Sequence, residues 1–217
     1  MAELHDALSH ILWLGGGPQS GKTTLSRLLA GKYELKIYNL DWHAVRDHER
    51  RPSAAIAAFQ RLSMDERWAV PDAHELVERS IALWEEGFTL VIEDLLALSP
   101  SRTIVAEGPG AFPWSVAPII SSPRQALFLV PTRARREVAA TRRWGADQVE
   151  RFPGIIDRDR ALANVRERDA LLDARIIASC RELGLRCERM DGSRDLDDNM
   201  ALLEDQFRPY LPATPNV

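Results

Sequence analysis

The sequence predicts an α/β fold in which helices cover both faces of a five-stranded parallel sheet. Short apolar segments alternate five times with longer stretches of helical periodicity, and neighbouring parallel strands need such helical crossovers. A length of 217 residues suits one domain with an insertion better than two domains. The predicted strands are residues 11–14, 35–40, 103–106, 126–130 and 186–190.

The boundaries of these segments support the assignment. Glycines 15–17 close the first strand, and residues 22–31 then place three leucines on one helical face. Asp41 follows the second strand, and Asp191 with Gly192 follows the fifth. Because sheets of this kind bind ligands at the carboxyl ends of their strands, residues in these positions are the first candidates for function.

Helices are also predicted over residues 53–62 and 72–84, but residues 88–98 have two interpretations. As a strand, this segment would end in Glu93 and Asp94, a pair similar to the acidic end of a Walker B strand. As a helix, it places its apolar residues at helical spacing and stops at a Ser-Pro pair. We favour the helix, because the next segment is a better strand and needs a crossover before it.

Composition limits the classes of protein that this sequence can represent. It has 28 basic and 32 acidic residues, a net charge of −4 and 45% hydrophobic residues, which excludes a disordered chain and argues against nucleic acid as the main partner. Two cysteines, Cys180 and Cys187, are too few for a disulfide framework or a cysteine metal site. With no leader and no apolar run of membrane length, we expect a cytoplasmic protein that is a monomer or a homodimer.

The strongest motif lies directly between the first strand and the first predicted helix. It matches the phosphate-binding pattern G-x-x-x-x-G-K-[ST]. Its glycines let successive backbone amides turn inward around a polyphosphate, and the amides at the helix start add partial positive charge. Lys22 is placed to reach the β- and γ-phosphates, and the Thr23 hydroxyl is a hard oxygen ligand for Mg²⁺. The predicted nucleotide-binding residues are Gly16, Gly17, Pro18, Gln19, Ser20, Gly21, Lys22, Thr23 and Thr24.

With Asp41 after the second strand, this loop resembles that of the P-loop kinases of the nucleoside monophosphate kinase-like group, such as shikimate kinase, gluconate kinase and chloramphenicol phosphotransferase. The similar layout extends over most of the chain, and the loop is its specific part. The resemblance implies a three-layer P-loop NTPase fold, ATP and Mg²⁺ as cofactors, a helical acceptor-binding insertion and an arginine-rich lid. We place a single domain at residues 1–208, the insertion at about 42–87, the lid at about 132–165 and a flexible tail at 209–217.

Other classes of P-loop protein lack their motifs in this sequence. A GTPase needs N-K-x-D, an ABC ATPase needs its signature sequence, and AAA+ or motor proteins usually need a longer chain. A small kinase needs a phosphate loop, a carboxylate near the acceptor hydroxyl and arginines that close over the transferred phosphoryl group. We therefore predict ATP- and Mg²⁺-dependent transfer of the γ-phosphoryl group to a hydroxyl of a small molecule. The alternatives are a nucleoside or nucleotide kinase, and a regulatory ATPase without an acceptor.

Two carboxylates at strand ends are the candidates for the chemistry. Asp41 is predicted to orient or deprotonate the acceptor hydroxyl, although an Asp at this place can instead cap the following helix. Glu107 ends the third strand and is predicted to hold Mg²⁺ or, as the resemblance suggests, to bind the substrate; a structural ion pair is the alternative. Glu93 and Asp94 would replace it only if residues 88–98 formed a strand. Which of the two strand-end carboxylates is the base stays open.

Arginines crowd the segment after the fourth strand, where the resemblance places the lid. Arg142, Arg143 and Arg166 are predicted to stabilise the transferred phosphoryl group, and most of the other arginines are predicted to pair with nearby acids. The resemblance also places Asp191 and Gly192 beside the adenine base, with an ordinary turn as the alternative.

His43 and Trp114 are the remaining candidates for substrate binding. They lie in the two segments that we expect to build the acceptor pocket. For both, packing or a surface position is the alternative, because single histidines and tryptophans are more often structural than functional. No feature of the sequence identifies the acceptor.

Overall fold

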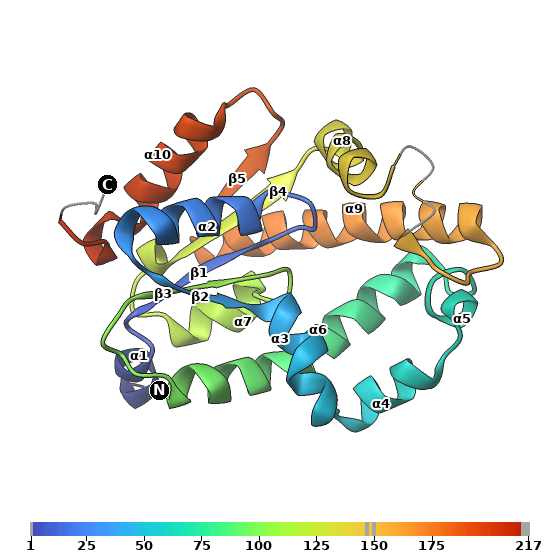
Figure 1. The fold of residues 1–217 in the computed structure, drawn as a ribbon, viewed down its shortest axis with the longest axis horizontal. Coiled ribbons are helices and arrows are strands. Elements are labelled where there is room, and N and C mark those ends of the chain that lie inside the picture. The colour runs from blue at the N-terminus through green and yellow to red at the C-terminus, as the bar shows by residue number, and fades with distance from the viewer. Residues whose placement is uncertain (1, 146–147, 149–150, 214–217) are drawn as a thin grey trace.

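The computed structural model describes residues 2–145, 148 and 151–213. Within this part of the chain, five parallel strands form one sheet in the order β2-β3-β1-β4-β5 (Figure 1). The strands are β1 (Ile11–Gly16), β2 (Lys36–Asn39), β3 (Ile104–Glu107), β4 (Ala126–Pro131) and β5 (Arg186–Met190). All five agree with the predicted strands to within a few residues.

Helices cover both faces of the sheet, which confirms the predicted three-layer α/β class (Figure 1). Two of them, α2 and α10, pack on one face, while α6, α7 and α9 pack on the other. The α-helices are α1 (Ala2–Ala7), α2 (Lys22–Tyr33), α3 (Leu40–Arg46), α4 (Ala54–Arg61), α5 (Met64–Trp68), α6 (Ala73–Ala97), α7 (Pro113–Val116), α8 (Arg133–Trp144), α9 (Arg158–Leu183) and α10 (Leu196–Phe207). Short 3-10 helices are η1 (His48–Arg50), η2 (Ala117–Ile119), η3 (Pro123–Gln125) and η5 (Arg208–Tyr210).

Strand β1 shows how the sequence builds the core on both sides of the sheet. Successive strand residues point to opposite faces. Ile11 and Trp13 therefore lie in the hydrophobic cluster under α6 and α9, whereas Leu12 and Leu14 lie in the cluster under α2 and α10. All four side chains are fully buried, as expected for a central strand covered on both faces.

Helix α6 joins two segments that the sequence predicts as separate helices. The prediction that residues 88–98 are helical is confirmed, but the helix is continuous from Ala73 to Ala97. With the partly buried Trp84, its inward-facing stripe from Val77 to Leu95 keeps alternating steps of four and three residues past Gly87. One interior glycine costs a helix only about 1 kcal/mol. Glu93 and Asp94 therefore lie on a helix and not at a strand end.

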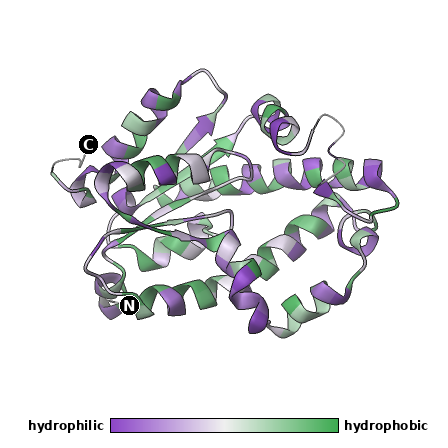
Figure 2. Ribbon diagram, in the orientation of Figure 1, coloured by the Kyte–Doolittle hydropathy of each residue, from purple (hydrophilic) through white to green (hydrophobic). Residues whose placement is uncertain are grey.

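Two long helices carry structure beyond the sheet. Helices α6 and α9 pack against each other, and α4 and α5 lie near the ends of these helices that are distant from the sheet (Figure 1). Both long helices alternate hydrophobic and hydrophilic residues along their length, as one buried side requires (Figure 2). A third cluster, which includes Leu76, Phe152 and Val165, packs where they meet α5. None of the helices in the described ranges combines the length and apolar composition needed to cross a membrane.

The region expected to be a flexible tail is only partly described. Residues 208–210 form η5, where the carbonyl oxygen of Tyr210 accepts a hydrogen bond from Thr103 Oγ1 at 3.4 Å. Tyr210 and Leu211 also pack against the cluster under α2 and α10. Residues 214–217 lie outside the described residues.

Candidate active site

The predicted phosphate loop connects the end of β1 to the start of α2 (Figure 1). Its backbone needs glycine at both ends, because Gly16 has a φ of 117° and Gly21 a φ of 94°. A Cβ on Gly16 would also collide with the backbone of Leu129 in β4. The amide of Gly17 donates to the carbonyl oxygen of Leu129 at 3.0 Å, which anchors the loop to the sheet.

Lys22, the first residue of α2, is folded under this loop and is only 5% exposed. Its Nζ donates to the carbonyl oxygen of Gly17 at 2.6 Å, to that of Gly16 at 3.2 Å and to Ser20 Oγ at 3.1 Å. Burial lowers the pKa of Lys22 to about 8, although nearby carboxylates favour its charged form. The loop thus holds a desolvated ammonium group directly beneath its turn.

Asn39 organises the ends of β2 and β3, a role that the sequence predictions did not include. Asn39 and Glu107 are partners in the parallel register, and Asn39 Nδ2 donates to Glu107 Oε1. Asn39 Oδ1 accepts from the backbone amide of Trp42 at 2.7 Å and so caps α3. The cap of α3 is therefore Asn39 and not Asp41, which rules out that structural explanation for Asp41.

Asp41 lies in the first turn of α3 and opens onto the same cavity as Lys22 and Glu107. Although its side chain is exposed to this cavity, enclosure by the surrounding protein raises the pKa of the Asp41 carboxyl above its ordinary value, and Lys22 acts to lower it. Glu107, by contrast, is only 1% exposed at the end of β3. The two predicted carboxylates thus share one cavity but differ strongly in their contact with solvent.

This main cavity has a volume of about 890 Å³ and brings together most of the predicted site. The predicted residues that line it are Pro18, Gln19, Ser20, Gly21, Lys22, Thr23, Thr24, Asp41, Glu107, Arg142 and Arg143. Those that the sequence predictions did not include are Arg67, Trp68, Trp84, Arg135, Arg151 and Arg168, together with other neighbours. The phosphate loop, both carboxylates and two predicted α8 arginines therefore surround one space.

Arg168 lines the cavity, whereas the predicted Arg166 does not. Two residues along a helix correspond to roughly 200° of rotation, which places the two side chains on nearly opposite sides of α9. Arg166 pairs with Glu137 at 2.9 Å, away from the phosphate loop. Arg168 is buried, with Nη1 donating to Ser80 Oγ at 2.9 Å and Nε 2.8 Å from Asp169 Oδ1.

His43 and Trp114, the other predicted substrate-binding residues, also lie outside the main cavity. His43 stacks on Tyr38 with ring centroids 4.0 Å apart, and its Nδ1 is 2.7 Å from Asp47 Oδ2. Trp114 stacks on Phe112, and its Nε1 donates to a glutamate of α6 at 2.7 Å. Both residues pack against neighbouring segments, which was the alternative to substrate binding for each of them.

Asp191 and Gly192 lie next to the phosphate loop. They line a small cavity of about 130 Å³ together with Ser20, Gly21 and Thr24 of the loop and α2. Arg135 of α8 lines both this small cavity and the main one, which makes the two spaces neighbours.

A buried ion pair connects α8 and α9 behind the loop. Arg136 Nη2 lies 2.5 Å from Asp173 Oδ2, and both side chains are largely buried. A Cβ on Gly17 would collide with Asp173, so this carboxylate packs against the loop itself. Burial raises the pKa of Asp173 to about 6, although Arg136 opposes the shift.

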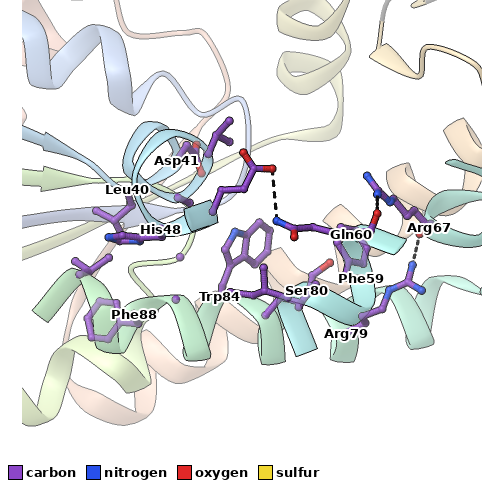
Figure 3. A pocket seen from close by; sticks show the side chains of 18 of the residues that line it. Leu40, Asp41, His48, Phe59, Gln60, Arg67, Arg79, Ser80, Trp84 and Phe88 are labelled. Atoms are coloured by element: carbon purple, nitrogen blue, oxygen red, sulfur yellow. Dashed lines mark hydrogen bonds between the residues drawn. The ribbon is translucent and has the colours of Figure 1, made fainter. Parts of the chain in front are cut away.

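A second cavity of about 340 Å³ adjoins the main one (Figure 3). It lies among α3, α4 and α6, in the segment expected to bind the acceptor. The two cavities share Asp41, Arg67, Trp68, Trp84 and Arg168 as lining residues. Asp41 therefore lies where the two cavities meet.

Comparison with known proteins supports the fold. No protein-family model matches the sequence, and no curated protein is detectably similar to it. Among solved structures, TT1252 from Thermus thermophilus is similar with a TM-score of 0.51 and 18% identity, over 93% of this chain and 98% of that one. An uncharacterized protein from Eubacterium ventriosum (TM-score 0.42, 11% identity, 92% and 98% covered) and a shikimate kinase from Bacteroides thetaiotaomicron (0.38, 16%, 92% and 94%) are also similar. The likeness to TT1252 over nearly all of both chains supports the five-stranded parallel α/β fold, and the loop between β1 and α2 carries the P-loop sequence pattern.

Proposed function

We propose that this protein is an ATP- and Mg²⁺-dependent phosphotransferase that moves the γ-phosphoryl group to a hydroxyl of a small molecule. One observation carries the proposal: the phosphate loop with Lys22, the carboxylates of Asp41 and Glu107 and the arginines of α8 all line one cavity. A second cavity opens beside Asp41, where an acceptor must bind to reach the γ-phosphate. An ATPase that used only water would not need this second space.

The loop and its neighbours would bind the nucleotide. The backbone amides at the start of α2 would bind the phosphates, and Lys22 would exchange its loop carbonyl partners for phosphate oxygens. The adenine base would bind beside Asp191 and Gly192, and Arg135, which lines both cavities, would then lie between base and phosphates. The planar guanidinium group of Arg135 suits stacking on a base.

The donor set also fits Mg²⁺. No group of three or more His, Cys, Asp or Glu side chains within the described ranges forms a metal site of its own. Mg²⁺ in nucleotide sites takes one or two protein oxygen ligands and completes its shell with phosphates and water. The Thr23 hydroxyl and the Glu107 carboxylate line the main cavity and supply such oxygens. When bound there, Mg²⁺ would neutralise charge on the phosphate oxygens.

The residues of the chain account for the transfer step. The acceptor oxygen forms a bond to the γ-phosphorus, the bond from that phosphorus to the oxygen bridging to the β-phosphate breaks, and ADP leaves. Asp41 would take the hydroxyl proton, and its raised pKa brings it closer to the working pH of a general base. Arg142 and Arg143 would balance the negative charge of the transferred group.

Incubation with MgATP and a mixed panel of alcohols, sugars, nucleosides and antibiotics tests the proposal. We expect ADP formation that depends on one acceptor, and phosphorus NMR should show the matching phosphate ester. If ADP forms at one rate regardless of the acceptor, the protein is a nucleotide-dependent ATPase. A phosphorylated nucleoside or nucleotide would instead identify a nucleoside or nucleotide kinase.

A further inference from the structure

We propose that the acceptor is an alcohol with an apolar body of about two-ring size, bound in the second cavity with its hydroxyl at Asp41. This inference rests on the proposed function and narrows its substrate class. It excludes polyols, sugars and nucleosides as the preferred acceptors.

The walls of the second cavity are mainly apolar. Helices α3, α4 and α6 contribute aliphatic and aromatic side chains, and Phe88 and Val91 close it with buried surfaces (Figure 3). The apolar lining residues are Leu40, Ala44, Val45, Ile56, Phe59, Trp68, Leu83, Trp84, Phe88 and Val91. An apolar cavity of about 150 Å³ holds one benzene ring, so the volume of about 340 Å³ suits a body of roughly two rings.

The polar groups on the α3 and η1 side of this cavity are already used by the protein. His48 is 3% exposed, and its Nε2 lies 2.8 Å from Asp94 Oδ2. Glu49 accepts a hydrogen bond from Gln60 at 3.4 Å (Figure 3). Within the described residues, the lining atoms His48 Nδ1 and Arg67 Nε are buried without a hydrogen-bond partner, and each offers a ligand one hydrogen bond at most.

The polar groups on the α6 side are occupied in the same way. Arg79 donates to the carbonyl oxygens of Glu66 and Arg67 and so closes the end of α5 (Figure 3). Ser80 accepts from Arg168, which lines both cavities and so lies at their junction. A buried hydroxyl without a hydrogen-bond partner loses its bonds to water and gains none in return. A sugar or polyol would bury several hydroxyls without hydrogen-bond partners, whereas an apolar body has no hydroxyls to bury.

Arginine side chains lie at the junction of the two cavities, where the phosphoryl group would be transferred. Arg67 and Arg168 both line the two cavities, and Arg168 lies 5.9 Å from the ring centroids of Trp68 and Trp84. Phosphoryl transfer needs cationic groups at this junction. The charge therefore fits the reacting end of the acceptor, and the apolar walls fit its body.

Gly87 offers a direct way to fill the second cavity. It lies within α6 and lines the cavity, and a Cβ added to it meets no other described atom within 4 Å. In Gly87→Leu, the Cβ of the new side chain has open space, and we expect the rest of the side chain to reduce the volume of the second cavity. Gly31→Leu is the matched control, because Gly31 lies exposed in α2 with equally open surroundings.

The test measures binding and transfer separately. Ligand-observed NMR with naphthalen-2-ylmethanol, without nucleotide, should show binding that Gly87→Leu weakens at least tenfold and Gly31→Leu leaves unchanged. In transfer assays with MgATP, 2-phenylethanol and naphthalen-2-ylmethanol should be phosphorylated at least tenfold faster than glycerol, gluconate or adenosine. Nucleotide affinity should stay within twofold of that of the unmodified protein in both variants.

The outcomes separate this inference from the proposed function. Faster phosphorylation of glycerol, gluconate or adenosine than of the aromatic alcohols overturns the substrate class and leaves the phosphotransferase intact. Binding of naphthalen-2-ylmethanol that Gly87→Leu does not weaken also overturns the substrate class. If the variant misfolds, the test rests on the unmodified protein, and failure of that protein to bind naphthalen-2-ylmethanol overturns the substrate class. Binding that depends on Gly87 without any acceptor-dependent ADP upholds the apolar site and refutes the proposed function.

Discussion

Asn39 should contribute more to stability and activity than its place between two strand ends suggests. Replacing it in Asn39→Ala removes the cap on the Trp42 amide, worth about 1 kcal/mol, and the hydrogen bond to Glu107. Glu107 is buried, and a buried acceptor that loses its partner costs about 1–3 kcal/mol. We therefore expect the free energy of unfolding to fall by about 2–4 kcal/mol.

Two further variants separate these contributions. Asn39→Ser keeps a cap oxygen but is too short to reach Glu107, so it should cost less than Asn39→Ala by about 1 kcal/mol. Asn39→Asp also keeps the cap but places a carboxylate against Glu107, so its unfolding free energy should fall as the pH rises from 5 to 8. Urea denaturation at these pH values measures both effects.

The reasoning would be refuted if all three variants unfolded at the same urea concentration as the unmodified protein. Equal stability of the Ala and Ser variants would show that the cap on α3 contributes nothing. A pH-independent Asn39→Asp variant would show that the two side chains are not in contact.

Three other predictions follow from the same geometry. Asp41→Ala should lower the transfer rate by about 10²- to 10⁴-fold while MgATP affinity stays within about twofold. Asp47→Ala, at the opposite end of α3 and outside the cavity, should leave both unchanged; full turnover by Asp41→Ala would exclude it as the base. Because Lys22 loses its proton near pH 8, MgATP affinity measured by displacement of a fluorescent nucleotide should fall about tenfold between pH 7 and 9; equal affinities would contradict this. Burial raises the pKa of Asp173 to about 6, so its contribution to stability is present at low pH and declines as the pH rises through 6. Between pH 5 and 7 the free energy of unfolding should therefore fall by about 1 kcal/mol more in the unmodified protein than in Asp173→Asn, and equal pH slopes in urea denaturation would count against it.

The phosphate loop and the strand ends could be predicted because their chemistry is local. Gly16 and Gly21 are required by backbone geometry within the loop, and the motif occurs between a strand and a helix. Asp41 and Glu107 were found because parallel strands end on one edge of the sheet. These arguments need only short stretches of sequence.

Residues that depend on helix phase or on distant partners were harder to predict. Arg168 lies on α9 between Val165 and Leu172, and the spacing of these buried residues could have favoured it over Arg166. Asn39 occurs where a helix cap is expected, but its partner Glu107 is 68 residues away. The second cavity is lined by several helices whose relative positions depend on packing, which the sequence pattern does not determine.

Isothermal titration calorimetry with the magnesium complex of a non-hydrolysable ATP analogue measures whether the loop binds a nucleotide. We expect binding at one site for the unmodified protein and at least tenfold weaker binding for Lys22→Ala, because the variant loses the cation beneath the loop. Folded protein that releases no heat with millimolar nucleotide, or equal affinity in the two proteins, would contradict a phosphate-binding role for residues 16–23.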